Sequence, residues 1–427
     1  MSSGLEILCH KLEETMALRR EKGRLIEPPS PGKLKDMIDF SSNDSLSLST
    51  SGALTRAFLR QLQLHPGFTV GSTSSRILDG TKQYLLDLER DIAKFHRAEA
   101  AMFFNSGYDA NVAVWSTIPQ PGDFVVYDEY VHASIHDGMR RGRANTMTFR
   151  HNDPNALKLC LETIRSENVD VSEGNQVVFI ALESFYSMDG DAAAVVELLE
   201  AAHSTLPLKN FIFSIDEAHS NGIIGPDGSG FICEYGLEDQ FPIRLQTYGK
   251  GMGSTGAALL CNETIKSGLI NYARGVVFST APSFVSAAAV RAAYDIIASD
   301  EGKNRRRRLQ ENVRHFYHRL TSHAKWPEVK RKGILYLPTE KSWGSGPFQS
   351  PIVPIVPRPG LAVDLGKHLE AAKYWVNTVH YPIVPKNMDR IRIVLHTDND
   401  IRQIDHVVEL IMEWAMKQMG RKGIAKL

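Results

Sequence analysis

The sequence predicts an α/β protein in which helices cover both faces of a mostly parallel central sheet, followed by a smaller α+β domain. Over residues 45–285, apolar runs of strand length alternate with segments of helical periodicity, a pattern typical of βαβ units. Beyond residue 285 a long helical run, short strands and a final helix follow. We therefore expect an N-terminal helix and connector over 1–44, a large domain over 45–285 and a small C-terminal domain over 286–427.

Five apolar runs in the large domain have the composition of buried strands, because they are short and rich in valine, isoleucine and phenylalanine. Segments with an amphipathic helical pattern, such as residues 81–96 and 195–206, lie between them. Strands that are apolar throughout are expected in a parallel sheet. The predicted strands are AAMFF (100–104), DFVVYD (123–128), QVVFIALE (176–183), FIFSIDEA (211–218) and IRLQTY (243–248).

The two ends of the chain complete the predicted architecture. The first 35 residues have the pattern of an amphipathic helix that ends in a proline-rich connector, EPPSPGK. Residues 283–320 are predicted to form one long helix that joins the two domains. A proline-rich stretch, SPIVPIVPRPG, and a final helix from about Asn399 belong to the small domain. No apolar run has the length of a membrane span.

The composition argues against several classes of function. Lys plus Arg and Asp plus Glu number 49 each, so no global charge favours nucleic acid or an anionic membrane. The four cysteines lack the spacing of a zinc ribbon or of a disulfide framework, which is typical of a reducing compartment. Small molecules are therefore the expected partners.

Three short motifs suggest other functions but lack the context that those functions need. Residues 251–256 match GxGxxG, yet a strand-like run, AALLC, follows where a dinucleotide site requires a helix. Residues 216–219 spell DEAH, but the chain has no phosphate-binding GxxxxGK[ST] loop. His132 and His136 have the spacing of two metal ligands on a helix, without a third ligand nearby in the sequence.

Three other features lie where predicted elements end or begin. Asp216 ends one strand and is followed by His219. Thr247 ends another strand and is followed by Lys250, while Ser106-Gly107-Tyr108 marks a strand-to-helix turn. Ligands of an open parallel sheet lie beyond the carboxyl ends of its strands, so these features are expected to share one crevice. A phosphate site, a buried carboxylate and a lone lysine are what pyridoxal phosphate requires.

Each of these residues also has a purely structural interpretation. A strand-end aspartate such as Asp216 usually caps the next element, and His219 could be an ordinary loop histidine. An isolated Lys250 would more often be a surface charge. Their order along the chain and their shared context favour the cofactor site over these alternatives.

Several segments, in the same order, resemble the α-oxoamine synthases, which are fold-type-I pyridoxal phosphate enzymes. The resemblance covers about residues 38–415. It implies a three-layer, aminotransferase-like fold and a reaction that joins an amino acid to an acyl-CoA with loss of carbon dioxide. The segments are FSSNDSLSL, NSGYDAN, HASIHDG, ESFYSMDGD, IDEAHSNGIIGPDGSG, TYGKGMGSTGAALL and RIRIVLHT.

The resemblance implies specific roles at the cofactor ring. Lys250 would bond covalently to the cofactor and would remove the α-proton of the bound amino acid. Asp216 would pair with the pyridine nitrogen, and His219 would reach the ring hydroxyl. His132 would stack on the ring face, and Ser187 would lie close to the ring oxygen.

The resemblance also implies where phosphate and substrate bind. Arg392 would hold the substrate carboxylate, and Asn43 would approach the substrate from the N-terminal segment. Ser279 and Thr280 would reach the phosphate of a neighbouring subunit, so a homodimer with active sites at its interface is expected. Within one subunit, the phosphate site would comprise Ser106, Gly107, Tyr108 and Thr247.

Within the family, the segments are most similar to members that condense L-alanine with pimeloyl-CoA in biotin synthesis. Another member of the family, using glycine or a different acyl donor, is the alternative, and a non-catalytic subunit is a third class. The family's NDYLGL and glycine-rich segments appear here as residues 43–48 and 71–76, and Leu85 replaces a histidine. These departures bear on acyl specificity. Ala425-Lys426-Leu427 is a close variant of a peroxisomal address, so the expected location is the peroxisome or the cytoplasm.

Overall fold

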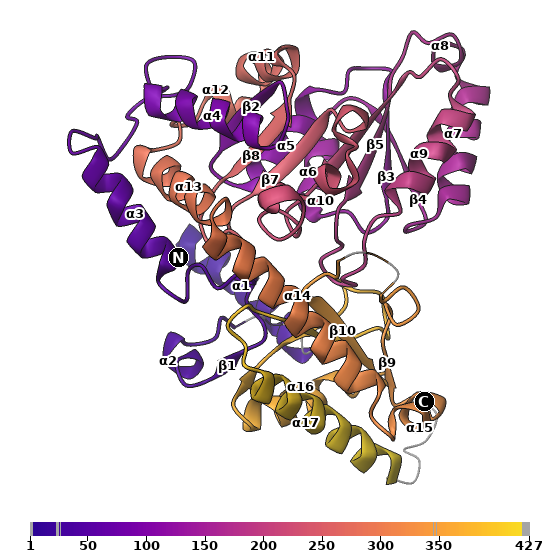
Figure 1. The fold of residues 1–427 in the computed structure, drawn as a ribbon. Coiled ribbons are helices and arrows are strands. Elements are labelled where there is room, and N and C mark those ends of the chain that lie inside the picture. Colours follow the sequence, from indigo (N-terminus) through magenta and orange to yellow (C-terminus); the bar gives the residue numbers. More distant parts are fainter. Residues whose placement is uncertain (1–2, 23–24, 26, 345, 347, 421–427) are drawn as a thin grey trace.

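The structure, a computed structural model, describes residues 3–22, 25, 27–344, 346 and 348–420. Figure 1 shows a large lobe built around a seven-stranded sheet and a smaller lobe formed mainly by the C-terminal part of the chain. The predicted class, a mostly parallel α/β sheet with a smaller α+β part, is confirmed. The limits that the sequence suggests for the domains, at residues 44 and 285, stay a prediction.

The large sheet has the strand order β2-β8-β7-β6-β5-β3-β4. β8 runs antiparallel to β2 and β7, and the other neighbouring strands are parallel. All five predicted strands are present, and AALLC forms β8. The sequence analysis missed β4 because its sequence, NTMTF, contains no apolar run. The bounds are β2 Ala100–Phe104, β3 Phe124–Asp128, β4 Asn145–Phe149, β5 Val178–Glu183, β6 Phe211–Asp216, β7 Ile243–Thr247 and β8 Ala257–Cys261.

Helices cover both faces of this sheet, because alternate side chains of a strand enter different cores. In β2, Ala101 and Phe103 belong to one buried cluster, and Met102 and Phe104 belong to another. Burial on both faces explains why the strands are apolar throughout. The first core includes α3 Ala53–Leu64, α4 Gln83–Phe95, α7 Pro154–Glu167, α8 Val169–Ser172, α9 Val195–Thr205, α10 Phe231–Tyr235 and α13 Phe284–Ile297; the second includes α5 Gly107–Thr117, α6 Ala133–Arg141, α11 Glu263–Tyr272 and α12 Arg274–Val277.

The smaller lobe is built on a four-stranded sheet with the order β12-β13-β10-β9. Its strand β10 lies inside the proline-rich stretch, where buried isoleucine and valine side chains supply strand propensity. β1 from the N-terminal segment pairs with β11, so this segment contributes to the smaller lobe. The bounds are β1 Ile38–Asp39, β9 Leu335–Tyr336, β10 Ile352–Pro357, β11 Tyr374–Trp375, β12 Asn377–Val379, β13 Arg390–Val394, α14 Asp300–Thr321, α15 Trp326–Arg331, α16 Ala362–Ala371 and α17 Ile401–Gly420.

The single long helix expected over residues 283–320 is two helices, α13 and α14, so this prediction is corrected. Ser299 lies between them in extended conformation as the N-cap of α14, and Asp300 and Glu301 occupy its first turn. Acidic residues after a serine N-cap favour a new helix start, because they complement the helix dipole. The first turn of α14 packs closely against the end of α13, because a Cβ on Gly302 would lie 2.5 Å from the carbonyl oxygen of Ile296.

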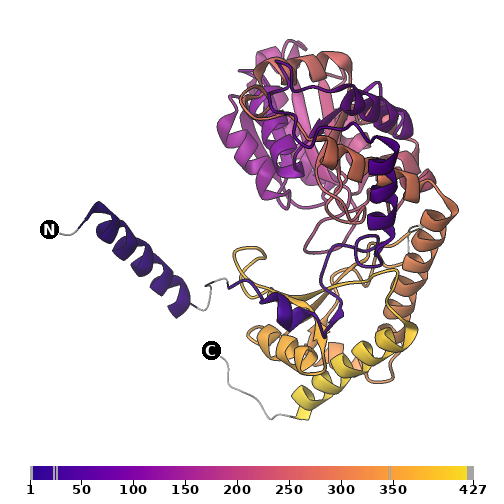
Figure 2. The same cartoon turned by 90° about the vertical axis from the view of Figure 1, so that its left-hand side faces the viewer.

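The predicted N-terminal helix is present as α1 (Gly4–Glu21), and α2 (Pro31–Leu34) follows it. Figure 2 shows α1 lying apart from both lobes, and none of its residues is buried. Its capping box between Ser3 and Glu6 stabilises its start. Among the described residues, no helix combines the length and the apolar character needed to cross a membrane. The C-terminal Ala425-Lys426-Leu427 lies outside the described residues.

Candidate active site

A pocket of about 350 Å³ opens where the parallel strands β5, β6 and β7 end. This edge of the sheet is where the sequence places a ligand crevice. The structure brings most of the predicted residues to this one pocket, and Arg392 contacts two of them. The predicted residues that line it are Asn43, Ser106, Gly107, Tyr108, His132, Ser187, Asp216, His219, Thr247 and Lys250.

Lys250 follows β7 and directs its amine into the pocket, where Nζ lies 2.9 Å from Nε2 of His219. Burial lowers the pKa of Lys250, and the negative charges of Asp216 and Glu183 oppose this shift without cancelling it. Burial, reinforced by Lys250 and Arg392, holds the pKa of His219 well below its ordinary value. A neutral His219 therefore accepts the hydrogen bond from Lys250.

Asp216 ends β6 and is held by neutral donors. Its Oδ2 accepts a hydrogen bond from Asn111 Nδ2 at 2.8 Å, and its Oδ1 accepts one from the backbone N–H of Ala218 at 2.9 Å. The side chain is buried, and in the described part of the chain no arginine or lysine forms an ion pair with it. A fixed carboxylate without a cationic partner is suited to bind a protonated ring nitrogen.

His132 is the N-cap of α6, and its ring lines the pocket. Its Nδ1 lies 2.7 Å from the hydroxyl of Ser134, which in turn accepts from Asn111 at 3.0 Å. Because Asn111 also donates to Asp216, this network fixes the orientation of two predicted site residues together. Burial lowers the pKa of His132, so the ring is a flat neutral surface suited to stacking.

The phosphate end of the pocket lies at the start of α5. The hydroxyl of Ser106 accepts from the backbone N–H of Asp109, so this side chain serves as the N-cap. The first-turn N–H groups of Gly107 and Tyr108 have no partner within the helix and attract anions. Glycine is required at 107, because a Cβ there would lie 2.5 Å from Cγ2 of Thr247.

Two hydroxyl groups that line the same pocket support the interpretation that it binds a phosphate group. Thr247 Oγ1 and Ser254 Oγ are buried, and neither has a hydrogen-bond partner among the described residues. Buried hydroxyl groups without partners are rare in proteins and indicate a missing ligand or water. Together with the helix N-terminus, the carboxylate of Asp216 and the amine of Lys250, they fit pyridoxal phosphate.

Arg392 reaches the pocket from β13 of the smaller lobe. Its Nε donates to the backbone carbonyl of Ser187 at 2.6 Å, and its Nη2 donates to Asn43 Oδ1 at 3.0 Å. Burial lowers the pKa of Arg392 to about 10. In the described residues no carboxylate lies within ion-pair distance of this guanidinium, so its charge is free to bind a substrate carboxylate.

Ser279 and Thr280 do not line this pocket. They line a neighbouring cavity of about 190 Å³, which shares only Asn105 with it. The hydroxyl of Ser279 donates to the backbone carbonyl of Gly275. Their predicted contact with a neighbouring subunit's phosphate stays a prediction.

Six polar residues of the pocket were not predicted, namely Asn105, Asn111, Ser134, Glu183, Ser254 and Thr255. Glu183 ends a predicted strand beside Asp216 in the sheet, so its position at the same edge was a usable signal. Its Oε1 is buried without a hydrogen-bond partner. Asn111 lies one helical turn after Gly107 and faces the same pocket, while Ser254 carried no signal beyond its glycine-rich surroundings.

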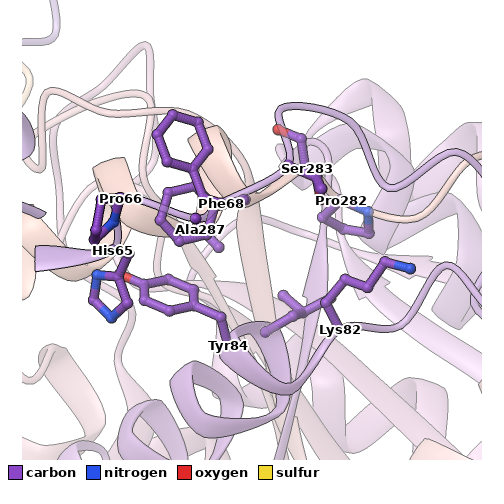
Figure 3. A pocket seen from close by; sticks show the side chains of 12 residues that line it. His65, Pro66, Phe68, Lys82, Tyr84, Pro282, Ser283 and Ala287 are labelled. Atoms are coloured by element: carbon purple, nitrogen blue, oxygen red, sulfur yellow. The ribbon is translucent and has the colours of Figure 1, made fainter. Parts of the chain in front are cut away.

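The alternative motifs do not form other sites in the described structure. The GxGxxG segment leads into β8 and not into a helix. No group of three metal-binding side chains occurs among the described residues. An apolar pocket of about 420 Å³ lies elsewhere, with the rings of His65, Phe68 and Tyr84 on one side and Pro282 and Lys82 on the other (Figure 3). It includes none of the predicted site residues.

Comparison with known proteins identifies relatives over nearly the whole chain. The family model for aminotransferase class I and II matches residues 35–409. An aminoacyl transferase sphA of Aspergillus fumigatus is 39% identical over 96% of this chain and 89% of its own. An 8-amino-7-oxononanoate synthase of Emericella nidulans is 39% identical over 95% of this chain and 96% of its own. The serine palmitoyltransferase structure of Sphingomonas wittichii shares the fold, with a TM-score of 0.79, 24% identity and coverage of 98% and 99% of the two chains.

Proposed function

The chain belongs to the α-oxoamine synthases, within the class I and II aminotransferases, and on this premise we propose that it condenses L-alanine with pimeloyl-CoA. The products are 8-amino-7-oxononanoate, CoA and carbon dioxide. Pyridoxal phosphate is the cofactor of this family. The observation that carries the proposal is a pocket lined by a buried lysine and a buried carboxylate, together with a buried arginine that contacts two lining residues, Ser187 and Asn43, and has no ion-pair partner among the described residues.

The role proposed for each residue of the pocket follows from its charge and its hydrogen-bonding groups. Pyridoxal phosphate, when bound, supplies an electron sink for the electrons left at the α-carbon. Lys250 removes the α-proton of the amino acid, and its lowered pKa favours the neutral amine that a base requires. Asp216 would hold the ring nitrogen of the cofactor in its protonated form. Thr247 and Ser254, whose buried hydroxyl groups have no hydrogen-bond partner among the described residues, would hold the phosphate.

The amino acid is oriented by its carboxylate. Arg392 presents a planar guanidinium whose Nε and Nη2 are already held by Ser187 and Asn43. Such a pre-organised donor binds a carboxylate with little loss of side-chain entropy. By holding the carboxylate, Arg392 would orient the amino acid so that its α-proton faces Lys250.

The thioester requires space beside the amino acid. A second cavity, of about 670 Å³, shares His132 and Ser187 with the cofactor pocket and is lined mainly by apolar side chains such as Ile383 and Val384. A cavity of this size and character fits an acyl chain. We place the acyl group of the donor there, next to the reacting carbon.

A different acyl donor is the second candidate. The sphA relatives from Aspergillus fumigatus and Byssochlamys spectabilis, at 39% and 38% identity, are named aminoacyl transferases. The Aspergillus fumigatus relative is as similar to this chain, by identity, as the Emericella nidulans relative is. The departures at residues 71–76 and at Leu85 bear on acyl specificity, but they do not line the cavity in which we place the acyl group, and Leu85 lines the separate apolar pocket of about 420 Å³. The reaction type is the same in both cases.

The assembly is proposed to be a homodimer. Ser279 and Thr280 line a cavity beside the cofactor pocket but do not enter it, which agrees with a role at the partner's phosphate. Removing both hydroxyl groups by Ser279→Ala and Thr280→Ala should weaken cofactor retention without changing the pocket of the same subunit. Sedimentation analysis that finds only monomers under assay conditions would rule out this assembly.

The decisive experiment measures CoA release by the purified, cofactor-loaded protein. Pimeloyl-CoA and palmitoyl-CoA are each supplied with L-alanine, glycine or L-serine in parallel. Release confined to pimeloyl-CoA with L-alanine supports the leading proposal, and release confined to palmitoyl-CoA supports the second candidate. Absence of release with all six pairs would contradict both.

We further propose that the protein acts in the peroxisome. Support comes from the terminal tripeptide and from the chemistry of the donor, since a pimeloyl thioester can arise from fatty acyl chains. An N-terminally tagged protein should localise to peroxisomes, and deletion of Ala425-Lys426-Leu427 should disperse the signal. An unchanged distribution after the deletion would contradict this location.

A further inference from the structure

A histidine outside the pocket lies between two carboxylates at the base of a turn that lines the pocket. His151 lies two residues after the end of β4. Its Nδ1 is 2.9 Å from Asp128 Oδ1, and its Nε2 is 2.8 Å from Asp191 Oδ2. Because ionised carboxylates only accept hydrogen bonds, both ring nitrogens must donate, and the ring is an imidazolium. We refer to Asp128, His151 and Asp191 as the clamp.

The clamp is packed and further bonded on each side. The ring of His151 stacks on Tyr130 at 4.5 Å and meets the ring of Tyr186 edge-on at 4.4 Å. Asp128 also accepts from the backbone N–H of Asn152, and the amide of Asn152 donates to Asp191 at 2.8 Å. The position of Asp191 is therefore fixed from two neighbouring residues.

Asp191 closes a tight turn over residues 186–191. The backbone N–H of Tyr186 donates to the carbonyl of Asp191 at 3.1 Å, and that of Gly190 donates to the carbonyl of Tyr186 at 2.8 Å. Gly190 has a φ of 68°, and a Cβ there would lie 2.2 Å from the carbonyl oxygen of Ile352. The turn consequently has no room to shift towards the smaller lobe.

The far side of the turn contacts two arginines of β13. Arg390 binds the carboxylate of Asp189 at 2.6 Å and the carbonyl of Met188 at 3.0 Å. Arg392, two residues on and therefore on the same face of the strand, donates to the carbonyl of Ser187 at 2.6 Å. The turn thus connects the clamp to the guanidinium that we assign to the substrate carboxylate.

We propose that His151 is a positioning residue for amino-acid binding: by bridging Asp128 and Asp191 it holds the 186–191 turn so that the carbonyl of Ser187 fixes Arg392. The inference rests on the proposed function in one respect, the assignment of Arg392 to the substrate carboxylate. His151 does not line the cofactor pocket, although its partner Asp128 also accepts from the backbone N–H of Tyr130, in the segment that leads to His132. Its loss is expected to affect the amino acid and not the cofactor.

The test is a titration of the cofactor-loaded protein with L-alanine, glycine and L-serine, followed by visible absorbance and without any acyl-CoA. His151→Gln should raise the Kd of the amino acid about tenfold, the effect of losing one charge-assisted constraint. Asp191→Asn removes the negative charge from one end of the bridge by an isosteric change and provides a second variant if His151→Gln folds poorly. The double variant should lose less than the sum of the two single effects, because both changes act on the His151–Asp191 contact.

A matched control separates positioning from general destabilisation. His315 makes a comparable contact, with Nε2 2.8 Å from Asp405 Oδ1, between α14 and α17. His315→Gln should leave the amino-acid Kd unchanged. In both clamp variants, cofactor content should equal that of the unmodified protein.

Three outcomes would overturn the inference. These are an amino-acid Kd within twofold of the unmodified protein in both clamp variants, a parallel loss of cofactor, and an equal effect of His315→Gln. An unmodified protein that responds to none of the three amino acids would overturn both this inference and the proposed function. A protein that binds the amino acid yet releases no CoA would remove only the proposed acyl transfer, and the titration would still decide the role of His151.

Discussion

The cofactor pocket and the 186–191 turn differ in whether their buried charged groups have partners of opposite charge, although Ser187 belongs to both. At the turn, each buried charge has an opposite charge close by: His151 is paired with Asp128 and Asp191, and Arg390 is paired with Asp189. In the pocket, Arg392 has no described carboxylate partner, and Thr247 and Ser254 have unpaired hydroxyl groups. Because unpaired buried groups are costly, the difference marks which region is completed by ligands.

The pairing at the turn is expected to make the pocket more specific. A charge that is paired internally cannot reorganise when a ligand arrives, so it holds its neighbours in place. A charge without a partner gains most when a ligand supplies one. The paired charges of the 186–191 turn therefore form rigid contacts next to the cofactor pocket. The charged groups of the pocket itself stay available to bind a ligand.

The largest expected effect on activity follows from removing Lys250, the lysine of the cofactor pocket. Lys250→Ala should reduce CoA release at least about a thousandfold, because both the covalent attachment of the cofactor and the base are lost. The visible absorbance of the lysine-bound cofactor should disappear as well. Lys158→Ala, which removes an exposed lysine near Glu162, is the control. A Lys250→Ala protein that retains turnover would contradict the site.

The next effect tests the unpaired guanidinium. Arg392→Lys should raise the KM for the amino acid about tenfold or more, since an ammonium group cannot reproduce the planar two-point contact with a carboxylate. The KM for the acyl-CoA should change much less. Steady-state kinetics with each substrate varied in turn distinguishes the two constants. Equal increases in both would mean that Arg392 does not bind the amino acid selectively.

The clamp predicts a stability that depends on pH. Burial lowers the pKa of His151, but hydrogen bonds to Asp128 and Asp191 outweigh burial and raise the pKa to about 10. A raised pKa stabilises the fold fully below the ordinary value of 6.5, and this stabilisation is lost as the pH rises towards 10. The difference in unfolding free energy between the unmodified protein and His151→Gln should shrink over this window by at most about 1.4 kcal/mol per pH unit.

Urea unfolding at a series of pH values measures this difference directly. His315→Gln, whose contact lies outside the clamp, should not reproduce the trend. A stability difference that stays constant between pH 6.5 and 10 would show that His151 is not charged in the folded protein.

The smallest expected effect concerns Glu183. Burial, with a further contribution from Asp216, raises the pKa of Glu183 well above its ordinary value, which favours the neutral form of its carboxyl group. Glu183→Gln preserves shape and neutrality, and we expect turnover to fall by no more than about threefold. Glu183→Ala, which removes the side chain, should cost more. A large loss in the glutamine variant would indicate that a charged carboxylate is needed.

Sequence alone determined the strands whose side chains are apolar throughout, because burial on both faces of a parallel sheet leaves an unambiguous pattern. The polar strand β4 carries no such pattern, and in β10 the apolar pattern is interrupted by prolines; both strands are completed by pairing with their neighbours. The break between α13 and α14 was likewise missed, since helical periodicity continues across Ser299. The local sequence pattern therefore predicts the elements whose side chains are buried throughout. The remaining strands depend on pairing with neighbouring strands, which the local pattern does not show.

The same division holds for the site. The order of Asp216, His219 and Lys250 along the chain indicated the cofactor chemistry, because the ends of parallel strands must meet at one edge of the sheet. Only the tertiary structure decided that Arg392 has no ion-pair partner in the part of the chain that it describes and that His151 is bridged by Asp128 and Asp191. These contacts join residues from distant segments, and whether a buried charge is paired depends on which of those segments the fold brings within hydrogen-bond distance.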